Sequence, residues 1–146
     1  MKNLSLSTRL SVIGATLMLA LLTACSFTTA HLSSFKLGKD KDVTTETSKF
    51  GPKDEVWAKT EVSNVPSKVT LKFSLVLVKV EGQPEGLHNP GTDYNIDMAS
   101  SGTGTYHLTP PPAGWPAGTY RVEVAMVTDS GEQKDQKTAE FTVSGS

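Results

Sequence analysis

The chain has 146 residues, enough for one domain, and 37% of them are hydrophobic, an ordinary fraction for a folded protein. Fourteen basic and fifteen acidic side chains nearly balance, which excludes a strongly basic nucleic-acid-binding surface and the composition of a disordered chain. The three histidines, His31, His88 and His107, are scattered, and none has a second ligand at a useful spacing. We therefore expect no metal, no cofactor and no nucleic-acid partner.

The first 24 residues have the pattern of a secretory signal. Lys2 and Arg9 make the start basic, and an apolar run follows over residues 11–22. This run is about a dozen residues long, whereas a membrane-spanning helix needs about twenty. The run ends in Leu22-Thr23-Ala24-Cys25, which contains the single cysteine of the chain. One cysteine cannot form an internal disulfide, so Cys25 needs another role.

The segment from Leu22 to Cys25 resembles the lipobox of bacterial lipoproteins. The resemblance implies cleavage before Cys25, a diacylglycerol on its sulfur and a fatty acyl chain such as palmitate on its new amino group. Each buried methylene contributes about 0.8 kcal/mol, and two or more chains hold a protein stably on a membrane. By the same resemblance, Ser26 directs the protein to the outer membrane if the organism is Gram-negative. We expect an exported, lipid-anchored envelope protein.

Cleavage changes the charge and defines the mature chain. The signal contains two basic residues and no acidic ones, so twelve basic and fifteen acidic side chains remain, a formal charge of −3. Residues 25–34 show little periodicity and are predicted to be the lipidated Cys25 followed by a flexible tether. The folded domain is predicted over residues 35–146. Phe35 and Leu37 alternate with polar residues, which predicts a first strand at the edge of a sheet.

Two longer strands follow. Residues 55–63 place Val56, Ala58, Thr60 and Val62 on one face and Trp57, Lys59 and Glu61 on the other. Residues 69–80 alternate up to Leu75, and then Val76, Val78 and Val80 make both faces apolar. Such a run is either a central strand covered on both sides or a strand whose facing switches at a bulge.

The remaining segments are short strands between turn signals. We expect a loop at 82–91, strands near 94–98, 106–108, 120–126 and 138–143, and a hairpin turn at 129–132. No segment has helical periodicity over three turns. About seven strands in about 110 residues predict an all-β fold, an antiparallel β-sandwich.

The stretch from Pro116 to Val122 is similar to the Asp-x-Gly-x-Tyr-x-Cys segment of immunoglobulin-like domains. The resemblance implies that the Tyr120 hydroxyl closes the corner before the penultimate strand. Val122 stands in the place of the second cysteine and Pro116 in that of the acid, while Phe73 takes the place of the core tryptophan. These departures are typical of disulfide-free bacterial immunoglobulin-like and fibronectin-like modules.

The sequence lacks the patterns of the common catalytic sites. There is no Gly-x-Ser-x-Gly elbow, and the glycine-rich residues 102–104 lack the lysine and following helix of a phosphate-binding loop. Asp93 and Asp97 lack the further oxygen ligands of a calcium site, so we expect solvated carboxylates. We expect a protein without catalytic residues.

Four residues are candidates for partner binding: Trp57, Val76, Val78 and Trp115. Trp115 lies in a tight turn between Gly114 and Pro116, and we expect it to plug the end of the core rather than to form an exposed platform. Trp57 is either covered by the first strand or exposed on a sheet face. The face with Val76 and Val78 is expected to be hidden core rather than an interface.

The functional hypothesis is a lipid-anchored envelope protein that acts as a binding or scaffold module for a protein or a glycan. The alternative is an inhibitor of an envelope or foreign hydrolase. It rests on a faint resemblance of residues 89–92 and 101–104 to the inhibitory loops of chagasin-like cysteine-protease inhibitors. The third loop of that family is missing at residues 129–134.

Overall fold

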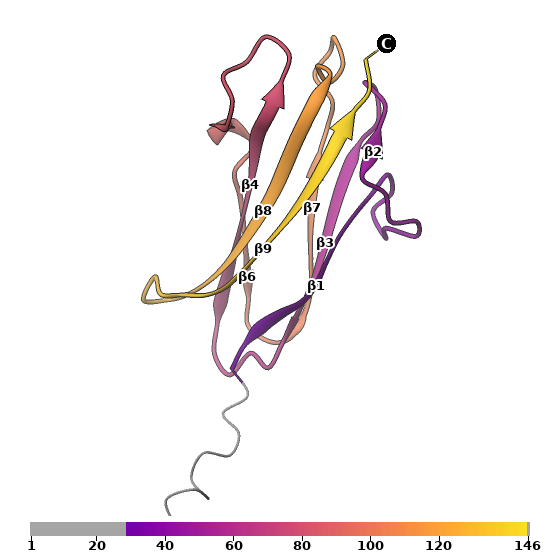
Figure 1. The fold of residues 1–146 in the computed structure, drawn as a ribbon. Helices are drawn as coiled ribbons and strands as arrows, with labels where there is room; N and C mark the ends of the chain where they lie inside the picture. The colour runs from indigo at the N-terminus through magenta and orange to yellow at the C-terminus, as the bar shows by residue number, and fades with distance from the viewer. Residues whose placement is uncertain (1–28, 146) are drawn as a thin grey trace, which may run out of the picture.

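The computed structural model describes residues 29–145, so the predicted signal and Cys25 lie outside the described residues. The described chain forms nine strands and one short 3₁₀ helix (Figure 1). The strands form two sheets packed face to face. The prediction of an all-β sandwich is confirmed, whereas the immunoglobulin-like type stays a prediction.

The smaller sheet contains three antiparallel strands in the order β1-β3-β7. These are β1 (His31–Gly38), β3 (Val56–Ser63) and β7 (Gly102–Leu108). β3 is central and follows the predicted alternation, because Val56, Ala58, Thr60 and Val62 are buried. Thr60 can be buried because its hydroxyl donates a hydrogen bond of 2.7 Å to the Ser34 carbonyl.

The larger sheet contains six strands. They are β2 (Lys49–Phe50), β4 (Val69–Val80), β5 (Leu87–His88), β6 (Tyr94–Met98), β8 (Gly118–Thr128) and β9 (Gln133–Val143). β8 and β9 form a long antiparallel hairpin, and β4 pairs with β8 on one side and with β5 and β6 on the other. The short β2 is parallel to β9.

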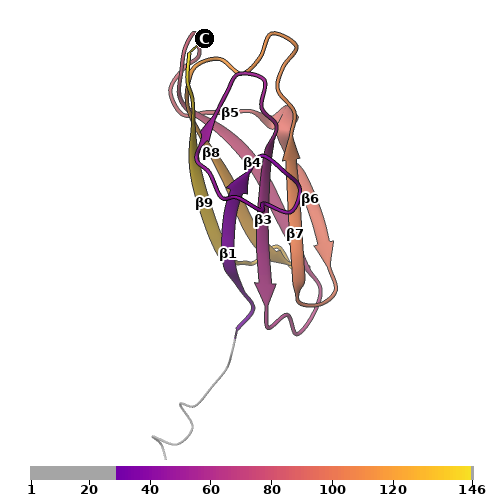
Figure 2. The ribbon, with the colours of Figure 1, turned by 90° about the vertical axis from the view of Figure 1, so that its right-hand side faces the viewer.

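The two sides of the sandwich differ. On one side β1 contacts β9, and the Leu32 amide donates a hydrogen bond of 2.8 Å to the Asp135 carboxylate. On the other side the smaller sheet ends at β7, and β6 belongs to the other sheet (Figure 2). Within the described residues β7 pairs only with β3 and β6 pairs only with β4. This second side is therefore the open edge of the sandwich.

The core is built by the inward faces of both sheets. Tyr120, Val122, Val124 and Met126 of β8 are all buried, as their alternation predicts. Phe73 of β4 is also buried, and its ring stacks on that of Tyr106 with centroids 5.0 Å apart. Burying such side chains contributes about 1.5–3 kcal/mol each and is the main stabilising term of the fold.

A bulge in β4 explains part of its doubly apolar end. The pairing with β8 shifts between Leu77 and Lys79, so the side chains beyond the bulge change face. Val80 therefore returns to the core and is buried. Gly118 lies opposite, with φ +150°, and a Cβ there would lie 2.3 Å from the Lys79 carbonyl oxygen. The bulge accounts for Val80, whereas Val76 precedes the bulge and is buried on the face opposite to Leu75.

The corner before β8 is closed as the sequence predicts. The Tyr120 hydroxyl donates a hydrogen bond of 2.7 Å to the Pro116 carbonyl, and burial raises the pKa of Tyr120 to about 12. Trp115 is only 7% exposed and packs edge-on against Tyr120 and Phe141. Its indole nitrogen donates to the Asp54 carbonyl at 2.8 Å. Trp115 plugs the end of the core.

The start of the domain differs from the prediction. β1 begins at His31, so residues 31–34 belong to the sheet and not to a tether. The reason is that Leu32 is buried in the core and its amide binds the side chain of Asp135 from β9. A bulge between Leu32 and Ser34 hides the alternation from a simple sequence pattern.

Candidate functional site

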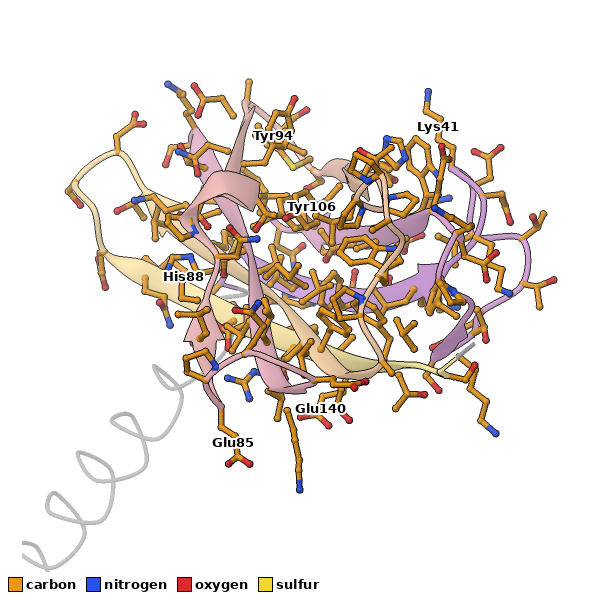
Figure 3. All side chains as sticks on the ribbon, turned by 90° about the horizontal axis from the view of Figure 1, so that it is seen from above. Lys41, Glu85, His88, Tyr94, Tyr106 and Glu140 are labelled. Carbon is orange, nitrogen blue, oxygen red and sulfur yellow. The ribbon has the colours of Figure 1, made fainter. Side chains whose placement is uncertain are left out.

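A groove of about 530 Å³ runs along the open edge of the sandwich. One wall is the end of β7 with the segment that follows it, and the other wall is the segment that leads into β6. Figure 3 shows Tyr94 at the surface of this edge and Tyr106 deeper in the molecule. The lining residues that matter below are Asp93, Tyr94, Tyr106, His107 and Trp115.

The floor of the groove is an aromatic stack that reaches from the core to the solvent. Phe73 stacks on Tyr106, and Tyr106 stacks on Tyr94 with centroids 6.5 Å apart and planes 20° apart. Tyr106 is 3% exposed, whereas Tyr94 is 55% exposed. Burial raises the pKa of Tyr106, and the nearby Asp93 adds to this effect. The Tyr106 hydroxyl stays protonated and donates to the Thr92 carbonyl at 2.5 Å.

The wall before β6 is held by its own hydrogen bonds. The Asn89 side chain accepts from the Gly91 amide at 3.2 Å and caps the 3₁₀ helix η2 (Pro90–Thr92). The Asn89 amide donates to the Leu75 carbonyl of β4 at 3.0 Å, which ties the segment to the sheet. A wall fixed in this way is preorganised, so a ligand would not have to order it.

One carboxylate lies in the groove. Asp93 Oδ1 lies 2.7 Å from His88 Nε2, and both side chains are about half exposed. The residues that line the groove include no lysine and no arginine. The groove therefore offers aromatic surface together with one acidic group.

An outward-facing stack adjoins the groove on the smaller sheet. Trp57 of β3 and His107 of β7 stack with centroids 3.8 Å apart and planes 8° apart. Glu55 Oε2 accepts from the Trp57 indole nitrogen at 3.3 Å and lies 3.3 Å from His107 Nε2. Trp57 is half-buried, because His107 covers one face of its ring.

A loop shields the other neighbour of Trp57. Gly38 of β1 is its cross-strand partner, and a Cβ on Gly38 would lie 2.9 Å from the Val43 side chain. Lys59 Nζ donates to the Asp42 carbonyl at 3.4 Å. The loop of residues 39–46 thus folds onto the sheet next to Trp57, and only a glycine at position 38 leaves it room.

The four candidate residues do not form one surface. Trp57 reaches the groove through its contact with His107, and the buried Trp115 is one of the residues that line the groove. Val76 and Val78 lie on β4 in the other sheet, where Val76 is cross-strand from His88 and Arg121. Val76 is buried and Val78 is half-buried, but neither belongs to the core cluster between the sheets.

The most exposed aromatic residue of the groove was not among these candidates. Tyr94 lies on the strand expected near 94–98, where Ile96 and Met98 pack against the core and Tyr94 does not. Tyr94 is the first residue of β6, and its ring stacks on the solvent side of Tyr106. An aromatic residue directly after the turn at 89–92 was the signal that could have identified it.

Two sequence predictions concern ions and membranes. Asp97 accepts from the Thr70 hydroxyl at 2.8 Å and pairs with Lys68, and these contacts hold the pKa of Asp97 below its usual value. Asp93 pairs separately with His88. Among residues 29–145 no group of three or more His, Cys, Asp or Glu side chains could hold a metal ion. The same part of the chain contains no helix that is long and apolar enough to span a membrane.

Known proteins share the fold but not the sequence. No protein-family model matches the chain, and a comparison with curated proteins gives no match either. Among solved structures, the Pseudomonas fluorescens alkylpurine DNA glycosylase AlkC bound to DNA is similar over 80% of this chain and 30% of its own, with TM-score 0.51 and 11% identity. The chain thus spans less than a third of that protein, and the likeness concerns the fold alone.

Two further structures are more distant. A β-glucosidase from Listeria innocua is similar over 77% of this chain and 16% of its own, with TM-score 0.48 and 14% identity. The PmoD soluble domain from a Methylocystis species is similar over 82% of this chain and 94% of its own, with TM-score 0.41 and 12% identity.

Proposed function

We propose that the chain is a non-catalytic, lipid-anchored module of the bacterial cell envelope that binds a protein or glycan partner in the groove at the open edge. The observation that carries the binding role is Tyr94, a large aromatic side chain that is 55% exposed at a preorganised groove. Exposed aromatic surface with a few fixed polar groups is characteristic of binding sites. The anchor rests on the lipobox resemblance of residues 22–25.

The bonding of the groove residues supports binding rather than catalysis. Asp93 is paired with His88, and the Tyr106 hydroxyl is committed to the Thr92 carbonyl. His107 is held by Glu55 and by its stack on Trp57. These groups hold the walls in place, and their bonds are structural.

The position of the groove suits an anchored protein. β1 starts at one end of the sandwich, and the residues of the groove lie from its middle to the other end, where Leu108 pairs with Val56 (Figure 1). His31 follows Cys25 by only six residues. A lipid on Cys25 would hold the first end near the bilayer and present the groove away from it.

The two loops of the inhibitor hypothesis do not meet. Residues 89–92 precede β6 and residues 101–104 follow it, so β6 separates them and they lie at opposite ends of that strand. This separation gives no support to their joint insertion into the cleft of one protease. We therefore do not propose inhibition as a second function.

Two measurements test the proposal. Metabolic labelling with palmitate should label the wild-type protein and not Cys25→Ser; label that persists in the variant contradicts the anchor. For the groove, protein purified from membranes after reversible cross-linking should retain its partner, and Tyr94→Ala should lose it. Leu87→Ala is the matched control, because Leu87 is also an exposed apolar side chain, 40% exposed, but lies outside the groove lining. Equal capture by both variants contradicts binding in the groove.

A further inference from the structure

β7 is an edge strand that lacks the usual protection against pairing. Within the described residues its backbone pairs with β3 on one side only. Its seven residues, Gly-Thr-Gly-Thr-Tyr-His-Leu, include no lysine, no arginine, no acidic residue and no proline. Natural edge strands are normally blunted by such residues, by bulges or by a covering segment.

The other long edge strands of the sandwich are protected. β1 has a bulge between Leu32 and Ser34, and its side is closed by contact with β9. β9 has Lys134 and Lys137 in its first half, and its last residues pair with β2. β6 carries Asp97, which is paired with Lys68. β7 is thus the exception, and it is also the strand that forms one wall of the groove.

We propose that β7 accepts an extended segment of a partner protein as a fourth strand of the β1-β3-β7 sheet, with alternate side chains of that segment lying in the groove. This inference rests on the proposed binding function of the groove. An added strand would pair its amides with the unpaired side of β7, and its inward side chains would meet the aromatic floor. A glycan has no row of backbone amides to make these bonds.

A second copy of the chain fits the groove less well than a separate peptide. In a β7-to-β7 pairing, the inward side chains of the incoming strand would be Gly104, Tyr106 and Leu108. These are already buried in the core of their own domain. They could not also fill the groove of the other copy, so the occupant must be a segment with free side chains on both faces.

The groove defines the chemistry of that segment. β7 is seven residues long, so at about 3.3 Å per residue it accommodates about five to seven residues of extended chain. One inward position faces Tyr94 and Tyr106 and calls for an apolar or aromatic side chain. Another faces Asp93, which is bonded to His88 through Oδ1; because the lining contains no lysine and no arginine, a lysine or arginine of the segment would gain a favourable charge interaction with this carboxylate.

The test begins with a displayed library of random linear peptides selected on the purified domain. Enriched sequences should alternate and should combine an apolar or aromatic residue with a basic one. Selected peptides are then resynthesised in two forms, with N-methyl groups on the odd or on the even amides. In strand addition only one of these sets points at β7. Methylating that set should weaken binding at least about tenfold, since two or three hydrogen bonds are lost, whereas the other set should have little effect.

A matched pair of variants identifies the edge. Thr103 of β7 and Ser34 of β1 flank the same residue of β3, Glu61, from the two edges of the smaller sheet. Thr103→Lys and Ser34→Lys therefore place the same charge beside the same partner, and both are expected to fold. The peptides should lose affinity for Thr103→Lys and keep it for Ser34→Lys.

Each contrary result has its own meaning. Peptides that tolerate methylation of either set, or that bind both lysine variants equally, overturn strand addition; if Tyr94→Ala still abolishes their binding, the groove remains the binding site. A selection with no enrichment over an unrelated domain overturns the peptide partner, while capture that depends on Tyr94 would still support the groove and indicate a glycan. If no peptide is enriched and capture does not depend on Tyr94, the proposed function itself is contradicted.

Discussion

Replacing Tyr120 by phenylalanine tests the structural basis of the corner that ends the core. Tyr120 is 1% exposed, its ring stacks on Phe141 with centroids 5.0 Å apart, and its hydroxyl donates to the Pro116 carbonyl at 2.7 Å. Phenylalanine keeps the ring and its stacking and removes only the hydroxyl. The change therefore isolates one hydrogen bond in a buried setting.

The expected cost is that of one hydrogen bond. A net hydrogen bond contributes about 0.5–1.5 kcal/mol, and water can reach the exposed Pro116 once the hydroxyl is gone. We expect Tyr120→Phe to lower the free energy of unfolding by about 0.5–1.5 kcal/mol. The matched control is Tyr94→Phe, which removes a hydroxyl from a side chain that is 55% exposed and should change stability by less than about 0.5 kcal/mol.

Urea denaturation followed by tryptophan fluorescence measures both variants, and an alkaline series adds a second readout. Burial raises the pKa of Tyr120 to about 12, above its usual value of 10.0. The folded state then holds a proton that the unfolded state releases, so this stability is present below pH 10 and is lost as pH rises towards 12. Tyr120→Phe should therefore lose less stability than the wild-type protein as the pH rises from 10 towards 12. If both variants have equal stability and equal pH profiles, the corner hydrogen bond does not stabilise the fold.

Two further predictions concern the core and the acidic range. Gly104→Ala should destabilise the domain by about 1–3 kcal/mol, because its Cβ would lie 2.5 Å from the Leu71 side chain. Gly102→Ala should cost less, because its Cβ meets only the flexible end of Met98 at 3.4 Å. Equal urea midpoints for the two variants contradict this prediction. Lys39 holds the pKa of Asp54 below 3.8, so this stability is present above about pH 4 and is lost as pH falls. Asp54→Asn should flatten the acid side of the stability profile, and an unchanged profile contradicts the pairing.

The longer strands could be predicted where they have a single buried face. The alternation of Val56 with Ala58 and of Val122 with Val124 reports that face directly, and both pairs are buried as predicted. The corner of Tyr120 was recognisable because its hydrogen bond joins residues only four apart. Features that depend on neighbouring residues, such as strand alternation and short-range hydrogen bonds, can be predicted from the sequence.

The groove could not be predicted because it depends on where each sheet stops. β6 and β7 are consecutive strands, yet they pair in different sheets, and this separation forms the open edge. The stack of Trp57 on His107 depends on the register between β3 and β7, which no local pattern fixes. The start of β1 at His31 was missed because it depends on Asp135, far along the chain.

The groove as a partner-binding site is the central claim, and site-specific photo-cross-linking in intact cells tests it most directly. A photoreactive phenylalanine at Tyr94 replaces one exposed aromatic side chain by another, and the same residue at Leu87 is the control on an exposed site outside the groove lining. The account predicts a discrete cross-linked product from position 94 and none from position 87. Cross-linking from position 87 alone, or from neither position, would contradict it.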